Sequence, residues 1–169
     1  MVPLSVYMRY EDVDRGVALA DSAIMLSRNT DDLDGLHNAY TAKANALQIL
    51  IAQGKGPWSD DSVIVLHEKA LRIAASIEDT LGMSIAHFNL GSVYSSRNPF
   101  IALEHELEGF RLQREPNDLA QHSCYSTMAD CYGRLGQRDE SLNYGRLAVE
   151  AADRSGKKSI RVISRMSLG

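Results

Sequence analysis

The stretch DLAQHSCYSTMADCYGRLG, residues 118–136, decides how we interpret this chain. Its apolar and small residues recur every three or four positions, which is the period of an α-helix that buries one face. Ala129 is small, and the large residue Tyr132 follows about one helical turn later. A small side chain lets a neighbouring helix come close, while the large one fills the space beside it. The stretch therefore predicts a helix that packs tightly against another helix.

Two earlier stretches repeat this arrangement. The segments 32–35, 79–82 and 118–121 each begin with Asp, which can accept hydrogen bonds from the free N–H groups of the coming helix. Each segment is followed by a small residue and then by a large one. The small residues are Ala44, Gly91 and Ala129, and the large ones are Leu47, Tyr94 and Tyr132. The chain is therefore expected to repeat one structural unit three times.

A second periodic stretch follows each of the three helices. Its apolar face is predicted from Val63, His67, Ala70, Ala74 and Ile77, then Phe100, Leu103, Leu107 and Phe110, then Leu142, Gly145, Val149 and Ala152. Strand-like alternation is nearly absent, and most connections are short turns around Gly or Pro. We expect an all-α chain of about seven helices stacked as antiparallel pairs.

The third unit carries a recognisable motif: Tyr125, Met128, Ala129, Tyr132 and Gly136. With Ser141, Gly145 and Ala148 after it, the pattern resembles the tetratricopeptide repeat, and Phe88-Asn-Leu-Gly91 carries a second match. The resemblance implies a right-handed superhelical solenoid of the long-helix variety found in signalling and regulatory proteins.

The expected organisation is a single tetratricopeptide-like array over residues 1–169. It consists of an unpaired helix at 10–28, repeats at 32–77, 79–115 and 118–155, and the start of a truncated repeat at 157–169. A helix without its partner and a pair left unfinished indicate a piece of a longer array, or an array that another chain completes.

In tetratricopeptide proteins the first helix of each pair lines the inner, concave face, where an extended peptide binds. The resemblance therefore implies a set of partner-binding residues. They are Asn38, Thr41, Asn45, Gln48, Phe88, Asn89, Ser92, Asp130 and Arg134. Ile85, Ser126 and Thr127 are expected on the same face. Asparagine amides can both donate to and accept from a peptide backbone, and Phe88 could contact an apolar side chain. The alternative interpretation is a hydrated groove lined by ordinary polar residues.

Composition excludes several classes of protein. The chain has 169 residues, 44% of them hydrophobic and 24% charged, and its net charge of −4 lacks the basic footprint of a nucleic-acid-binding protein. No apolar run approaches the ~20 residues of a membrane span. Cys124 and Cys131 lie roughly 10 Å apart along a helix, too far for a disulfide within it. These features favour a cytoplasmic protein, with the periplasm as an alternative.

No group of residues predicts catalysis, a cofactor or a metal site. The histidines His37, His67, His87, His105 and His122 are scattered, and no pair shows H-x-x-x-H spacing. The acidic run Glu104, Glu106 and Glu108 is expected to be solvated surface. We therefore do not expect an enzyme.

The resemblance implies a non-enzymatic scaffold that binds a protein or peptide, within the sensor or regulatory region of a larger bacterial signalling protein. Two alternatives stay open. One is a fragment of a peptide-sensing transcriptional regulator, and the other is a self-association module that uses the incomplete ends of the array. The C-terminal stretch from residue 154 is basic and carries no acidic residue. Such a stretch could contact an anion, nucleic acid or an acidic partner, or it could form the solvated face of one helix. Its contrast with the acidic N-terminal half also favours head-to-tail association. Its basic residues are Arg154, Lys157, Lys158, Arg161 and Arg165.

Overall fold

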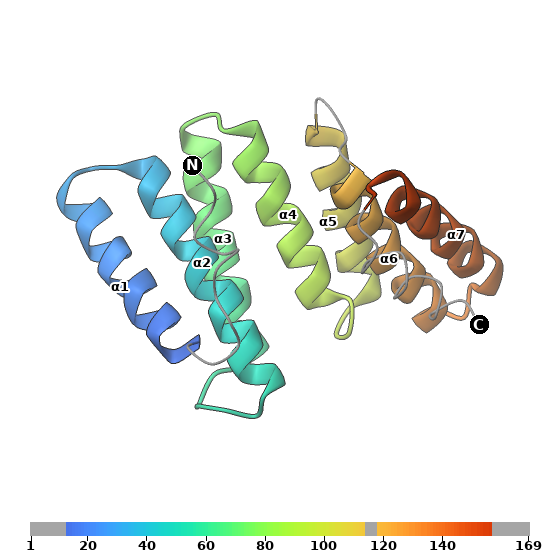
Figure 1. Ribbon diagram of the computed structural model, residues 1–169, viewed down its shortest axis with the longest axis horizontal. Coiled ribbons are helices and arrows are strands. Elements are labelled where there is room, and N and C mark those ends of the chain that lie inside the picture. The colour runs from blue at the N-terminus through green and yellow to red at the C-terminus, as the bar shows by residue number, and fades with distance from the viewer. Residues whose placement is uncertain (1–12, 114–117, 157–169) are drawn as a thin grey trace. The chain divides into compact units, whose positions relative to one another are not determined.

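A computed structural model describes residues 13–113 and 118–156 of the chain (Figure 1). Within these ranges the structure consists of helices joined by turns and loops, without any β-strand. The helices are α1 (Val13–Asn29), α2 (Leu33–Ala52), α3 (Asp60–Ser76), α4 (Thr80–Tyr94), α5 (Pro99–Leu112), α6 (Asp118–Arg134) and α7 (Arg138–Arg154). The prediction of an all-α chain is confirmed for this part of it. The first residues of the helix predicted at 10–28, and all of 157–169, lie outside the described residues.

Local sequence signals explain where several helices begin and end. The Asp32 carboxylate accepts a hydrogen bond from the Gly35 backbone N–H at 2.9 Å and so caps α2, as expected for a helix N-terminus. The Asn98 side chain caps α5, and Pro99 occupies the first turn, where its missing N–H costs nothing. Between α6 and α7 the chain turns at Gly136, whose φ of 74° favours glycine.

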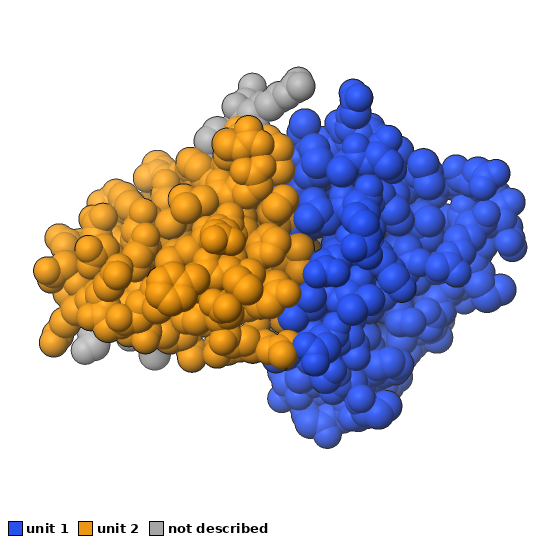
Figure 2. Space-filling view, turned by 180° about the vertical axis from the view of Figure 1, so that it is seen from behind, with its two compact units in different colours: residues 1–86 blue, residues 87–169 orange. Residues whose placement is uncertain are grey.

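The chain forms two compact units, residues 1–86 and residues 87–169, which we call the first and second units (Figure 2). In the first unit α1 packs on α2, and α2 packs on α3. In the second unit α5 packs on α6, and α6 packs on α7. Helices that adjoin in sequence therefore pack against each other within each unit.

The core of the first unit confirms the small and large pair predicted at its start. Ala44 and Leu47 on α2 are both completely or almost completely buried. Nearby, Ile24 of α1, Tyr40 of α2 and Ala70 of α3 form a buried cluster. Small residues at these contacts let the three helices approach closely.

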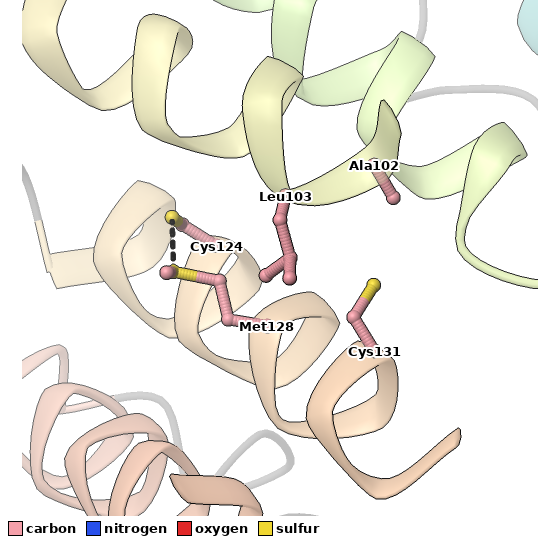
Figure 3. Packing of buried hydrophobic residues seen from close by; sticks show 5 residues of the cluster. All are labelled: Ala102, Leu103, Cys124, Met128 and Cys131. Atoms are coloured by element: carbon pink, nitrogen blue, oxygen red, sulfur yellow. Dashed lines mark hydrogen bonds between the residues drawn. The ribbon is translucent and has the colours of Figure 1, made fainter. Parts of the chain in front are cut away.

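The core of the second unit is a cluster between α5 and α6 (Figure 3). Leu103 of α5 packs against Cys124, Met128 and Cys131 of α6, and the Cys124 thiol lies 3.7 Å from the Met128 sulfur. Both cysteines are free and buried. They act here as small apolar residues that fill the space between two helices.

The prediction for the buried face of α5 is partly wrong. Phe100 and Leu107 were expected to be buried, but they are 65% and 57% exposed. The helix is turned so that two small residues and one acid lie inside with Leu103. The buried residues of α5 are Ala102, Leu103, Glu106 and Gly109. The close approach of α5 to its neighbouring helix determines which side of α5 is buried, since large apolar side chains at the contact would keep the two helices apart.

Candidate functional site

The four residues predicted on α2 lie together on its less buried side. Asn38 is exposed, while Thr41, Asn45 and Gln48 are half-buried. Residues spaced by three and four positions share one face of a helix, so these side chains form a continuous polar strip. Asn38 donates from Nδ2 to the Asp34 carbonyl oxygen at 2.9 Å. The Thr41 hydroxyl is buried and has no hydrogen-bond partner among the described residues.

On α4 the predicted residues have three different environments. Phe88 is half-buried and packs against the core cluster of the second unit. Asn89 is half-buried, and its Nδ2 is buried without a hydrogen-bond partner in the part of the chain that the structure describes. Ser92 is exposed, and its backbone carbonyl accepts from the Ser95 hydroxyl at 2.9 Å. Asn89 is therefore the residue of this set with an unused hydrogen-bonding group.

On α6 the two predicted charged residues bind each other. The Arg134 Nε donates to the Asp130 Oδ2 at 2.8 Å, one helical turn apart. Both side chains are about half exposed, so the pair is a surface ion pair of small energetic weight. The pair leaves this side of α6 close to neutral.

Sequence reasoning missed the acid at the centre of the second unit. Glu106 was expected to be solvated, but its side chain is only 1% exposed. It occupies the space above Gly91, where an added Cβ would lie 2.6 Å from Glu106 Oε1. Burial raises the pKa of Glu106 to about 8, and hydrogen bonds with Cys124 and Thr127 offset part of that rise. The carboxyl group is therefore mostly protonated at neutral pH.

In the sequence, Gly91 was the residue that could have indicated a side chain buried between α4 and α5. A small residue predicts that a neighbouring helix fills the space, but it does not predict which side chain does so. Glu106 Oε2 has no hydrogen-bond partner among the described residues, which adds to the cost of burying the group. The same acid helps to raise the pKa of the buried Cys124 thiol, whose burial is the main cause. That thiol is inert as a nucleophile at neutral pH.

A histidine pair joins α4 to α5 in the second unit. The Nδ1 atoms of His87 and His105 lie 2.9 Å apart, so one ring donates and the other accepts. Tyr94 stacks on His105 with ring centroids 5.7 Å apart. Burial lowers the pKa of His87, and the nearby Glu108 carboxylate offsets part of that shift. The pair is a polar packing contact between two neighbouring helices.

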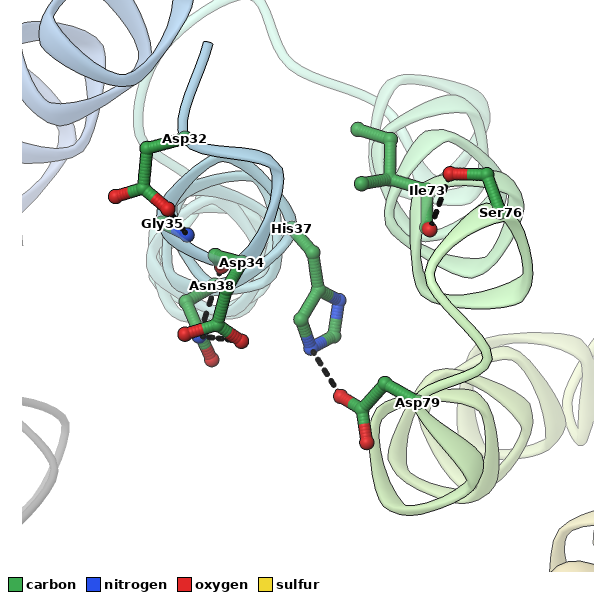
Figure 4. A network of polar contacts seen from close by, with 8 residues as sticks. All are labelled: Asp32, Asp34, Gly35, His37, Asn38, Ile73, Ser76 and Asp79. Atoms are coloured by element: carbon green, nitrogen blue, oxygen red, sulfur yellow. Dashed lines mark hydrogen bonds and ion pairs between the residues drawn. The ribbon is translucent and has the colours of Figure 1, made fainter. Parts of the chain in front are cut away.

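The first unit buries two histidines of its own. His37 Nε2 lies 3.8 Å from the Asp79 carboxylate, across the gap from α2 to the turn before α4 (Figure 4). His67 on α3 is completely buried, and neither ring nitrogen has a hydrogen-bond partner within the described ranges. Burial lowers the pKa of His67 to about 4. The imidazole is therefore neutral at physiological pH.

An open apolar hollow lies between α2, α3 and the loop before α3. Leu47, Trp58 and Val65 contribute to its lining, and its volume is about 380 Å³. Gly56 has a φ of 76°, and an added Cβ there would lie 2.8 Å from Trp58 Cδ1. The glycine loop therefore makes room for the indole ring at the edge of the hollow.

We also searched the described residues for a metal-binding group and for a membrane-spanning helix. Among residues 13–113 and 118–156, no three His, Cys, Asp or Glu side chains come together as a metal-binding group. None of the helices in these ranges has the length and apolarity needed to cross a bilayer.

No protein-family model matches the chain, and no curated protein sequence matches it. Its function has therefore to be inferred from its own residues.

Proposed function

We propose that the chain is a tetratricopeptide-like scaffold that binds an extended peptide segment of a partner protein. Its helices pack on their neighbours in sequence, as they would in a right-handed solenoid. The small residues Ala44 and Gly91 are buried at positions where this repeat brings helices close together. On α2, α4 and α6 the residues opposite these contacts are mostly polar and at least partly exposed.

The main support for the proposal is two buried polar groups that lack a hydrogen-bond partner among the described residues. The Thr41 hydroxyl on α2 and the Asn89 amide on α4 are each withdrawn from solvent without a hydrogen-bond partner among the described residues. A buried polar group without a partner costs roughly 1–3 kcal/mol, and a ligand that supplies the partner recovers this cost. A peptide backbone presents carbonyl oxygens and N–H groups at regular intervals, so one of its carbonyl oxygens can accept a hydrogen bond from the Asn89 Nδ2.

The charges along these helix faces indicate how the peptide is recognised. The strip on α2 is formed by uncharged amide and hydroxyl side chains, and Asp130 and Arg134 on α6 neutralise each other. Recognition therefore depends on hydrogen bonds to the peptide backbone more than on opposite charge. Binding of this kind depends only weakly on ionic strength.

The scaffold acts by binding alone and belongs to the sensor or regulatory region of a larger bacterial signalling protein, as the resemblance implies. A fragment of a peptide-sensing transcriptional regulator would use the same helix faces. Both versions of the proposal require that an extended peptide contact Asn89.

A peptide selection followed by calorimetry tests the proposal. A phage-displayed library of 12-residue peptides is selected on the full chain, and the selected peptide is titrated into the wild type, Asn89→Ala and Asn143→Ala. Asn143 is an exposed asparagine on α7 and serves as the matched control. We expect Asn89→Ala to weaken binding about tenfold, the loss of one hydrogen bond at about 1.4 kcal/mol, and Asn143→Ala to change it less than twofold.

Folding and binding are separable at this position. Asn89→Ala removes an amide whose Nδ2 is buried without a hydrogen-bond partner among the described residues, so it should not lower the free energy of unfolding. A selection that returns no binding peptide would contradict the proposal. Equal affinities of the wild type and Asn89→Ala would contradict it as well, and so would a strong dependence of the affinity on salt.

A further inference from the structure

The outer side of α1 is an apolar surface. The helix packs on α2 through buried residues that include Ala20, Ile24 and Ser27. On the other side Leu19, Met25 and Leu26 are 50%, 66% and 65% exposed. We call these three residues the α1 stripe.

The α1 stripe differs from the other exposed apolar residues. On α5 the exposed Phe100 and Leu107 are two helical turns apart, with the charged Glu104 between them. On α1 the three large side chains fall within about two turns of one side of the helix, around the small residue Ser22. A contiguous stripe of this kind can hold the apolar side of a partner segment.

The surroundings of the α1 stripe are acidic. Asp14 and Asp21 lie along one flank of the stripe, and three further acids follow α1 directly, at positions 31, 32 and 34. The only basic residues between positions 13 and 34 are Arg15 and Arg28. Asp21 already binds Lys43 at 2.6 Å, and Arg28 donates to the Tyr40 hydroxyl. The excess of acid remains, so the surface fits an apolar segment that carries positive charge.

The chain itself contains a segment of this composition. Residues 157–169, KKSIRVISRMSLG, combine four basic residues with five large apolar residues and include no acid. We propose that the α1 stripe binds residues 157–169 of a second copy of this chain. The charge of the segment complements the acids around α1, and its apolar side chains would cover Leu19, Met25 and Leu26.

The two surfaces of this contact are different parts of the chain, so the contact is head-to-tail. Each copy that binds through its α1 stripe still has a free segment 157–169. Such a contact builds open chains or closed rings rather than a symmetric dimer. This association is separate from peptide binding at Asn89, and it can fail without affecting that function.

Sedimentation velocity of the full chain tests the contact. For the wild type, the weight-average mass should rise above that of the 18.6 kDa monomer with concentration and fall again in high salt. Leu26→Glu should remain monomeric, because it places a carboxylate in the stripe. Leu107→Glu, a matched change at an exposed leucine of α5, should associate like the wild type. Met25→Glu replaces Leu26→Glu if circular dichroism shows that the first variant is not folded.

A mixing experiment identifies the partner surface. The double variant Arg161→Glu with Arg165→Glu keeps the α1 stripe but reverses charge in the segment, so alone it should be monomeric. Mixed with Leu26→Glu, which keeps the segment, it should form a one-to-one complex that grows no further. A wild type that stays monomeric overturns the proposal. So does a mixture without a complex, or association of the double variant alone, which would indicate contact between two α1 stripes.

Discussion

The first and second units each bury an ionisable side chain, and the two are of opposite chemical type. The first unit encloses the His67 imidazole on α3, and the second encloses the Glu106 carboxyl on α5. Burial disfavours the charged form of both groups. The same cause therefore lowers the pKa of His67 to about 4 and raises the pKa of Glu106 to about 8. We therefore expect acid to destabilise the first unit and alkali to destabilise the second.

Each unit also contains its own spectroscopic or chemical reporter. Trp58 is the only tryptophan of the chain and lies in the first unit. Cys124 and Cys131 are the only cysteines, and both are buried in the second unit. Tryptophan fluorescence therefore follows the first unit, and thiol labelling follows the second.

The largest expected effect concerns Glu106. Between pH 4.5 and 8 the unfolded chain has lost this proton while the folded chain keeps it, so rising pH favours unfolding. The second unit should lose about 5 kcal/mol of stability across this range, since each pH unit contributes about 1.4 kcal/mol. Glu106→Gln should remove most of this loss. The measurement is the rate of thiol labelling in urea at several pH values, corrected with free cysteine.

Glu104→Gln is the matched control for this prediction, because Glu104 lies on the same helix and is exposed. It should leave the alkaline loss unchanged. Equal pH dependence of the wild type and Glu106→Gln would show that the carboxyl is not held in its neutral form.

The next effect concerns His67 and has the opposite sign. Between pH 6.5 and 4 the unfolded chain takes up a proton that the folded chain excludes, so falling pH favours unfolding. The first unit should lose about 3 kcal/mol across this range. His67→Leu should abolish most of the loss, as measured by Trp58 fluorescence in urea at pH 4 to 7. An unchanged acid response in His67→Leu would assign it to other groups.

The smallest expected effect concerns the space that Glu106 occupies. Gly91→Ala places a Cβ 2.6 Å from Glu106 Oε1 and should destabilise the second unit by about 1–3 kcal/mol. Gly133→Ala on α6 is the control, because its Cβ would meet only the Ser141 side chain at 3.2 Å or more. That change should cost less than Gly91→Ala, because its contact is longer than 2.6 Å and alanine favours the helix. Urea unfolding measures both variants.

A double-mutant cycle sharpens the comparison further. In a Glu106→Ala background the cost of Gly91→Ala should largely disappear, because the side chain that clashes has been removed. A cost that persists in this background would place the strain elsewhere in the contact between α4 and α5.

The sequence was sufficient for the helices and for the faces of α2. A period of 3.6 residues places Asn38, Thr41 and Asn45 on one side of a helix, whatever packs against the other side. Ala44 and Leu47 could be predicted as core because a small and a large apolar residue one turn apart serve a close helix contact. These inferences depend only on residues within one helix.

The same reasoning failed on α5, where the buried side depends on another helix. Phe100 and Leu107 have the apolarity of core residues, yet the helix turns Ala102 and Gly109 inward and so approaches its neighbour closely. Glu106 becomes buried with them. Its raised pKa arises from desolvation by helices that the sequence does not place.

The amino-acid sequence by itself determined that the described part of this chain is helical and which sides of α2 and α3 are buried, because helix geometry is set by neighbours along the chain. Only the tertiary structure decided which acid is buried, and which thiols and amides lose their contact with water. These properties depend on residues far apart in sequence, since burial is the removal of solvent by everything that surrounds a side chain.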